Sequence, residues 1–156
     1  MVKPIPDGYH SVTVSLTFKD SKKALEFYKN AFGAKVLSTF PSLDGKGTMH
    51  ATMQIGDSIL MMGDEMGPHK SAESLGIETP TSLWIYTENA DAFFKKAIQA
   101  GAKETMPVGD MFWGDRMGSL KDPFGYIWSV ATHTRDLTDE QVKKNAEEFF
   151  SSMTKK

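Results

Sequence analysis

Residues 11–35 read SVTVSLTFKDSKKALEFYKNAFGAK and join a strand pattern to a helix pattern. Residues 11–18 alternate between small polar and apolar side chains, which is the period of a strand with one buried face. Asp20 or Ser21 can cap the following helix, and Gly33 is a typical helix end. Between them an apolar stripe recurs at helical spacing: Ala24, Leu25, Tyr28, Ala31 and Phe32. The stretch therefore predicts a strand followed by an amphipathic helix.

Three more strands are predicted after this helix. Residues 35–40 and 49–55 have strand composition, and the turn-forming residues 44–47 separate them. Gly56 and Asp57 then turn the chain into a further strand at 58–63. The resulting order is strand, helix, strand, strand, strand.

The second half of the chain repeats this order. Residues 81–87 alternate like a strand, and a helical stripe of Phe93, Phe94, Ala97 and Ile98 follows. The tripeptide Gly33-Ala34-Lys35 recurs as Gly101-Ala102-Lys103, 68 residues later, and Gly125 lies 69 residues after Gly56. A common tripeptide can recur by chance, but the caps, turns and strand order recur with it. An internal duplication is therefore the preferred interpretation.

These landmarks divide the chain into one domain with two units. We expect the domain at residues 8–135, with units at about 10–66 and 80–133. Residues 64–80 are rich in Gly, Pro, Ser and charge, which is typical of a linker.

An amphipathic helix is predicted at residues 138–153, after the second unit. Thr138 and Gln141 have the spacing of a capping box. One face is apolar: Val142, Ala146, Phe149, Phe150 and Met153. This face must be buried on its own domain or on a partner chain, and the pattern does not distinguish the two.

Composition excludes several classes of protein. The chain has 156 residues, a net charge of −2 and no Cys, so disulfides, zinc–thiolate sites and iron–sulfur clusters are excluded. The balanced charge argues against a nucleic-acid partner. No apolar run is long enough to span a membrane, and residues 1–6 lack a signal-peptide core, so we expect a soluble, cytoplasmic protein. No glycine-rich nucleotide motif is present, and we expect no cofactor.

Two local motifs carry a resemblance to a known family. They are the run DPFGYIW at 122–128 and the segment MFWGDR at 111–116, with Glu26-Phe27-Tyr28 leading to Ala31-Phe32-Gly33-Ala34. With the tandem βαβββ order, they resemble the vicinal oxygen chelate superfamily, in particular its PhnB-like glyoxalase/bleomycin-resistance branch. That resemblance implies an α+β fold in which each unit forms an open, curved four-stranded sheet with a ligand on its concave side. The C-terminal helix is an addition to it.

The resemblance also indicates where metal ligands would lie. Metalloenzymes of the superfamily use His, Gln or Glu from the first and fourth strands of each unit, and the equivalent positions here are Thr13, Met61, Ser82 and Ser129. These side chains supply neither imidazole nor carboxylate, so we expect no metal ion.

Strand alternation predicts which side chains line the concave faces. Alternation places His50, Gln54, Trp84 and Tyr86 among the predicted ligand-binding residues, and Phe112 and Trp113 are added as aromatic residues of a candidate cavity rim. Trp84 is the expected anchor; alternatively it faces the helix and belongs to the core. The rim would comprise Phe112, Trp113, Asp115 and Arg116; alternatively Trp113 packs in a loop and Arg116 makes a structural ion pair.

The expected function is metal-independent binding of a small molecule by a homodimer. The alternative is an enzyme of the superfamily (a lyase, isomerase or dioxygenase-like protein) with a displaced metal site or metal-free acid–base chemistry, and a structural dimerisation module is a third hypothesis. Candidate catalytic residues are His50, Asp115 and Arg116. For His10, His69 and His133 we expect exposure to solvent or hydrogen bonding.

Overall fold

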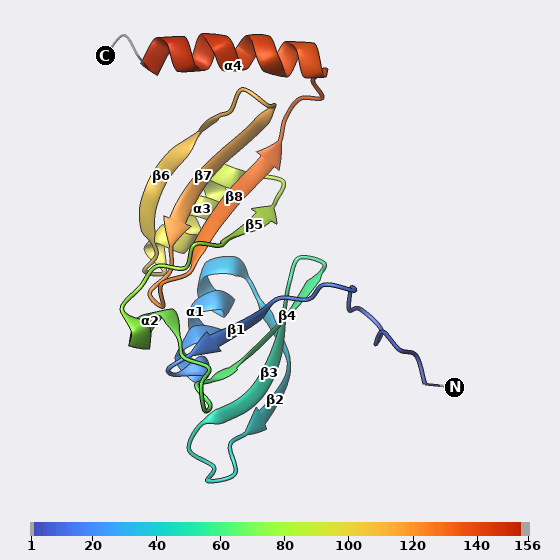
Figure 1. Ribbon diagram of the computed structural model, residues 1–156, viewed down its shortest axis with the longest axis vertical. Coiled ribbons are helices and arrows are strands. Elements are labelled where there is room, and N and C mark those ends of the chain that lie inside the picture. Colours follow the sequence, from blue (N-terminus) through green and yellow to red (C-terminus); the bar gives the residue numbers. More distant parts are fainter. Residues whose placement is uncertain (1, 154–156) are drawn as a thin grey trace.

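The computed structural model describes residues 2–153 and shows two stacked units, each a four-stranded sheet with one helix (Figure 1). The N-terminal unit contains β1 (Ser15–Phe18), α1 (Ser21–Phe32), β2 (Lys35–Pro41), β3 (Thr48–Ile55) and β4 (Ser58–Asp64). The C-terminal unit contains β5 (Ser82–Tyr86), α3 (Ala90–Gln99), β6 (Lys103–Asp110), β7 (Asp115–Lys121) and β8 (Ile127–His133).

The two sheets have the same topology. Their strand orders are β1-β4-β3-β2 and β5-β8-β7-β6. In each sheet the first strand pairs in parallel with the last, and the other neighbours are antiparallel. The predicted α+β fold of tandem βαβββ units is therefore confirmed.

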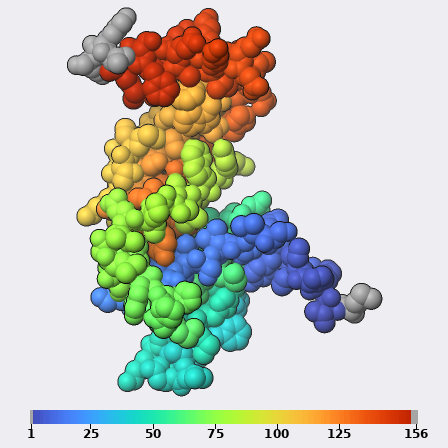
Figure 2. Space-filling view, viewed as in Figure 1, coloured from blue at the N-terminus to red at the C-terminus, as the bar shows by residue number. Residues whose placement is uncertain are grey.

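The first strand is shorter than predicted. Strand pairing begins only at Ser15, not at residue 11. The Thr13 hydroxyl donates a hydrogen bond to the carbonyl of His10 at 3.0 Å, which turns the chain away from the sheet. Val12 is consequently 87% exposed. Residues 2–14 form an arm whose N-terminal end projects from the body of the molecule (Figure 2), while Val14 packs against the core.

The helix ends follow the local sequence. Asp20 caps α1 by accepting a hydrogen bond from the Lys23 amide at 3.2 Å, and Gly33 ends the helix with φ of 67°. Asn89 caps α3 in the same way through the Ala92 amide at 2.9 Å. The two helices therefore begin at equivalent cap residues, Asp20 in the first unit and Asn89 in the second.

The two units share one core, in which α1 packs against α3. An aromatic cluster fills the junction: Phe18, Phe27, Tyr28, Phe32, Phe93, Phe124, Tyr126 and Trp128. Buried Asp122 accepts hydrogen bonds from the Tyr28 hydroxyl at 2.5 Å and the Trp128 indole at 2.9 Å. The DPFGYIW run is therefore a structural connection between the units.

Each sheet keeps the face opposite its helix open. In β5, Leu83 and Ile85 pack toward the core, while Trp84 is 46% and Tyr86 62% exposed on the other face. Trp84 therefore does not belong to the helix-facing core. The open face of the C-terminal unit is the surface on which a site can form.

Two further helices lie outside the units. The one-turn α2 (Ala72–Leu75) interrupts the segment between them, and α4 (Asp139–Met153) lies across the end of the C-terminal unit (Figure 1). Thr138 and Gln141 form the predicted capping box, with bonds of 2.9 and 3.3 Å. No helix within residues 2–153 has the length and apolar character needed to cross a membrane.

Candidate ligand-binding site

A groove of about 640 Å³ separates β5 from the N-terminal unit. Its volume lies within the usual range for small-molecule sites. The arm, the turn between β3 and β4, and β5 supply its walls, including His10, Val12, Thr13, Val14, Asp57, Ile59, Ser82, Trp84 and Tyr86. The rings of Trp84 and Tyr86 lie 6.2 Å apart at 34°, so the β5 wall is aromatic.

A buried carboxylate lies directly behind this aromatic wall. The side chain of Asp115, at the start of β7, is only 4% exposed. It accepts hydrogen bonds from the Tyr86 hydroxyl at 3.0 Å and the Trp113 indole at 2.9 Å. Its other oxygen lies 2.8 Å from Nδ1 of His133, which strand pairing places opposite it at the end of β8. Asp115 thus connects β5, the loop before β7 and the end of β8 through hydrogen bonds.

These contacts shift the pKa values of the cluster. Burial alone would raise the pKa of Asp115, but the hydrogen bonds from His133, Trp113 and Tyr86 outweigh it and lower that pKa. The pKa of His133 is raised by its hydrogen bonds to Asp136 and Asp115. Burial and Asp115 raise the pKa of the Tyr86 hydroxyl. The pair therefore favours a carboxylate beside an imidazolium.

The second nitrogen of His133 faces solvent. Its Nε2 lies 3.0 Å from a carboxylate oxygen of fully exposed Asp136, and the His133 side chain is itself 53% exposed. Because Asp115 holds Nδ1, the imidazole presents Nε2 in a fixed direction. Such an arrangement can donate a hydrogen bond or transfer a proton.

The hydrogen-bonded role predicted for His133 agrees with these contacts, but its place beside Asp115 was missed. The sequence contains a signal for this contact. The turn at residues 122–125 sets the register of the β7–β8 hairpin, in which Asp115 and His133 face each other. Asp136 lay beyond the last predicted strand, and no pattern pointed to it.

The positions equivalent to the family's metal ligands do not suit a metal ion. Ser82 and Ser129 bond to each other at 3.0 Å, and Ser119 joins them at 3.2 Å. Met61 offers only a thioether, and the Thr13 hydroxyl is bonded to the backbone. Such donors do not offset the dehydration of a divalent ion. Within residues 2–153, no three His, Asp or Glu side chains form a group that could hold one.

The predicted residues His50 and Gln54 lie on the other unit. Both are half-buried on β3, on the face opposite buried Ala51 and Met53. His50 lines a separate pocket of about 220 Å³ that also includes Thr17, Met49, Asp64, Met66 and His69. A single chain therefore does not bring His50 or Gln54 into the Trp84 groove.

Phe112 packs against α4. Its ring centroid lies 5.7 Å from those of Phe149 and Phe150, and its carbonyl accepts a hydrogen bond from Asn145 at 3.3 Å. Phe149 and Phe150 of α4 thus contact their own domain at Phe112, but no residue of α4 within residues 139–153 is buried. Adjacent Trp113 belongs instead to the Asp115 cluster.

Arg116 points to the face opposite Asp115. Its guanidinium bonds to Asp91 on α3 at 2.6 Å and to Asp110 on β6 at 3.1 Å. These bonds raise the pKa of Arg116 and lower that of Asp91. Arg116 therefore makes structural ion pairs on the helix side of the sheet, and it does not accompany Asp115 in a shared rim.

Comparisons with known proteins agree with this architecture. The family described as Glyoxalase/Bleomycin resistance protein/Dioxygenase superfamily matches residues 10–130. An uncharacterized protein of Mycobacterium bovis is 33% identical over 133 residues, covering 82% of this chain and 86% of that protein.

Two solved structures show the same fold. TioX from Micromonospora sp. ML1 superposes with a TM-score of 0.65 at 24% identity, covering 80% of this chain and 99% of that one. A putative 3-demethylubiquinone-9 3-methyltransferase, PhnB protein, from Bacillus cereus has a TM-score of 0.63 at 22% identity, covering 79% and 99%.

Proposed function

Because the chain belongs to the glyoxalase/bleomycin resistance protein/dioxygenase superfamily, we propose that it binds a small planar ligand without a metal ion. The groove between β5 and the N-terminal unit is the proposed site. Trp84 is its anchor, and Tyr86 extends the same aromatic wall.

The exposure of Trp84 and Tyr86 is the observation that carries this proposal. Two large aromatic side chains on one face of β5 line a groove of ligand size, to which Leu83, Ile85 and Trp128 also contribute. Exposed apolar surface of this kind marks binding sites. Stacking of a planar ligand on an indole contributes about 0.5–1.5 kcal/mol beyond the burial of its area.

Metal independence rests on the donor chemistry at Thr13, Met61, Ser82 and Ser129. Three hydroxyls and a thioether supply no anionic charge, and two of the hydroxyls are already paired with each other. This supports recognition by shape, stacking and hydrogen bonds.

An enzyme of the superfamily is the second candidate function. The pairing of Asp115 with His133 favours it, because a carboxylate that orients an imidazole is a common arrangement for proton transfer. In that case His133 replaces His50 and Arg116 as the leading catalytic candidate.

We also propose that the chain forms a homodimer. Both sheets leave one face open, and the N-terminal unit exposes Phe40 and Met49 as well as Leu37 on β2 and β3. A second copy would cover such surfaces and close the site. Light scattering at micromolar concentration should give twice the chain mass of 17.3 kDa, and a monomeric mass would contradict the proposal.

The proposed function is tested by metal analysis and ligand titration together. Protein purified without chelator is expected to hold no stoichiometric Zn, Ni, Mn or Fe. Calorimetric titration with 3-methylindole should show binding that Trp84→Ala weakens about tenfold, equivalent to 1.4 kcal/mol. Leu75→Ala, which removes an exposed apolar side chain from α2 outside the groove, is the control and should bind as the wild type does. One tightly held metal ion per chain, or binding indifferent to Trp84, would contradict the proposal.

A further inference from the structure

We propose that the ligand is a planar acid whose carboxylate binds Nε2 of His133 in the place that Asp136 occupies. The proposal rests on the proposed function, because the same ligand stacks on the aromatic wall formed by Trp84 and Tyr86. It adds the chemical class of the ligand and a polar anchor at the end of the open face.

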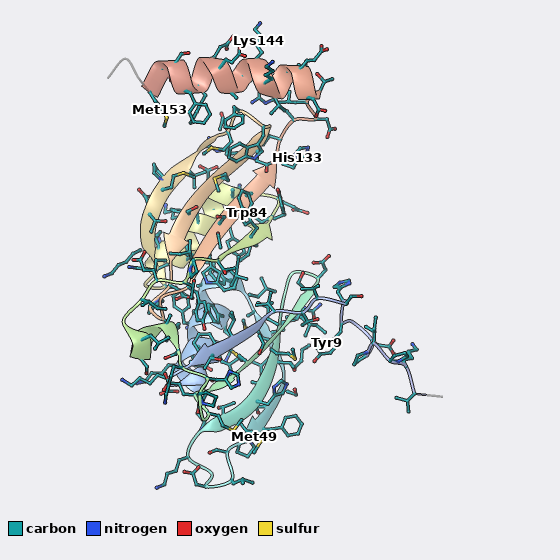
Figure 3. The ribbon with its side chains drawn as sticks, viewed as in Figure 1. Tyr9, Met49, Trp84, His133, Lys144 and Met153 are labelled. Carbon is teal, nitrogen blue, oxygen red and sulfur yellow. The ribbon has the colours of Figure 1, made fainter. Side chains whose placement is uncertain are left out.

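His133 lies within reach of a ligand in the groove. Tyr86 lines the groove and donates its hydroxyl hydrogen to Asp115, whose other oxygen contacts His133. Strand pairing sets Tyr86 beside Ala131, and His133 is two residues further along the same face of β8. Two residues of a strand span about 7 Å, so a ring that lies over the Tyr86 end of the aromatic wall can reach His133 with a short acidic side chain. Trp84, by contrast, lies beside Ser129, about 13 Å along the strand from His133. Trp84 and His133 both belong to the C-terminal unit (Figure 3).

The imidazole is prepared to donate from Nε2. Asp115 holds Nδ1 at 2.8 Å, and the contacts with Asp136 and Asp115 raise the pKa of His133, which favours the ring form that can donate from both nitrogens. The two oxygens of Asp115 already accept three hydrogen bonds from Tyr86, Trp113 and His133. Asp115 therefore has little capacity left for an amine, and the cluster offers an incoming group a cationic donor.

Asp136 shows what this donor accepts. Its carboxylate lies 3.0 Å from Nε2, although its side chain is fully exposed on the segment between β8 and α4. Exposed ion pairs contribute little to stability, so this contact exchanges readily. A ligand whose ring stacks on the aromatic wall while its carboxylate binds Nε2 would displace Asp136 from His133, because stacking adds a second interaction. The carboxylate of Asp136 thus marks the position proposed for the carboxylate of the ligand.

Three probes that share an indole ring system but differ in charge distinguish the possible ligand classes. Indole-3-acetate is an acid, 3-methylindole is neutral and tryptamine is a cation. Calorimetric titration should show indole-3-acetate binding about tenfold or more tighter than 3-methylindole, as expected for one hydrogen bond to a charged group. Tryptamine should bind no tighter than 3-methylindole.

Two substitutions test the anchor. His133→Gln should remove the advantage of indole-3-acetate, while His69→Gln, a change at an exposed histidine in the segment between the units, should keep it. Asp136→Asn should tighten indole-3-acetate binding by about threefold or more, because it removes the competing carboxylate. Asp7→Asn on the N-terminal arm is the matched control and should have no effect.

The outcomes separate this inference from the proposed function. Tightest binding of tryptamine, or weaker indole-3-acetate binding in Asp136→Asn, overturns the acid proposal. If 3-methylindole binds through Trp84 but indole-3-acetate binds no tighter, the acid proposal fails and the proposed function stands. If none of the three probes binds, both fail.

Discussion

The hydroxyl of Tyr28 offers a sharp test of how the two units are held together. Tyr28 is fully buried in α1, and its hydroxyl donates to Asp122 in the C-terminal unit at 2.5 Å. Asp122 is also buried and receives further bonds from the Trp128 indole and from the amides of Phe124 and Tyr126, each at 2.9 Å. Tyr28→Phe removes one of four donors to a buried carboxyl group and keeps the ring.

The expected loss is about 1.5–3 kcal/mol of unfolding free energy, the usual contribution of a hydrogen bond to a charged group. No cavity contribution is added, because the ring contacts with Phe27, Phe32 and Trp128 survive. For a chain of this size each kcal/mol lowers the Tm by about 2–4 °C, so a fall of about 3–12 °C is expected. Tyr126→Phe breaks bonds to the neutral backbone of Thr17 and should cost less, about 0.5–1.5 kcal/mol.

Urea denaturation of the three tyrosine variants provides the measurement. Tyr9→Phe on the N-terminal arm is the control and should stay within about 0.5 kcal/mol of the wild type. The order of destabilisation should be Tyr28, then Tyr126, then Tyr9. A Tyr28→Phe variant as stable as Tyr9→Phe would refute the view that Asp122 connects the units through this bond.

Three other changes have defined outcomes. Trp84→Ala should lower the unfolding free energy by less than about 1 kcal/mol, because the side chain lies on an open face; a loss of about 3–5 kcal/mol would place it in the core. The two flanking carboxylates raise the pKa of His133, so the folded chain holds that proton more tightly than the unfolded chain. Stability from this source is present below about pH 6.5 and lost as the pH rises through the folded-state pKa. Urea titrations at about pH 6 and pH 8 should show the fall in the wild type and a smaller one in His133→Gln. Gly114→Ala should destabilise the chain by about 1–3 kcal/mol, because φ is 104° and a Cβ would collide with the Arg135 carbonyl. Thermal melting beside Gly45→Ala, where φ is also positive but the space is open, checks this; equal losses would contradict the role of the collision.

The fold was predictable because the signals that specify it are local. Asp20 and Gly33 mark the ends of α1, and the alternation in residues 81–87 marks β5. Each signal is a property of a few neighbouring residues. Its recurrence in the second unit, about 68 residues later, supports the same assignment there. The exception was β1, where Thr13 bends the chain although the alternation continues back to residue 11. Periodicity describes which face a residue would occupy and does not show whether a partner strand is present.

The candidate site was only partly predictable, because it depends on contacts between distant residues. Alternation placed Trp84 and Tyr86 on one face of β5, as the structure has them. No strand was predicted at residues 115–121, so alternation was not applied to Asp115 and Arg116, which point to opposite faces of β7 and take different partners. Alternation also grouped His50 with Trp84, although the structure gives them separate pockets.

The amino-acid sequence alone determined the tandem units, their helix caps and the chemistry missing from the metal-ligand positions, because these are set by residue type and spacing along the chain. Only the tertiary structure decided that Tyr28 holds Asp122 across the units and that Asp115 orients His133 behind the Trp84 groove. Such pairs lie many residues apart, and their hydrogen bonds exist only when strand register and helix packing bring the two atoms within about 3 Å. Local patterns specify the elements, whereas the site arises where those elements meet.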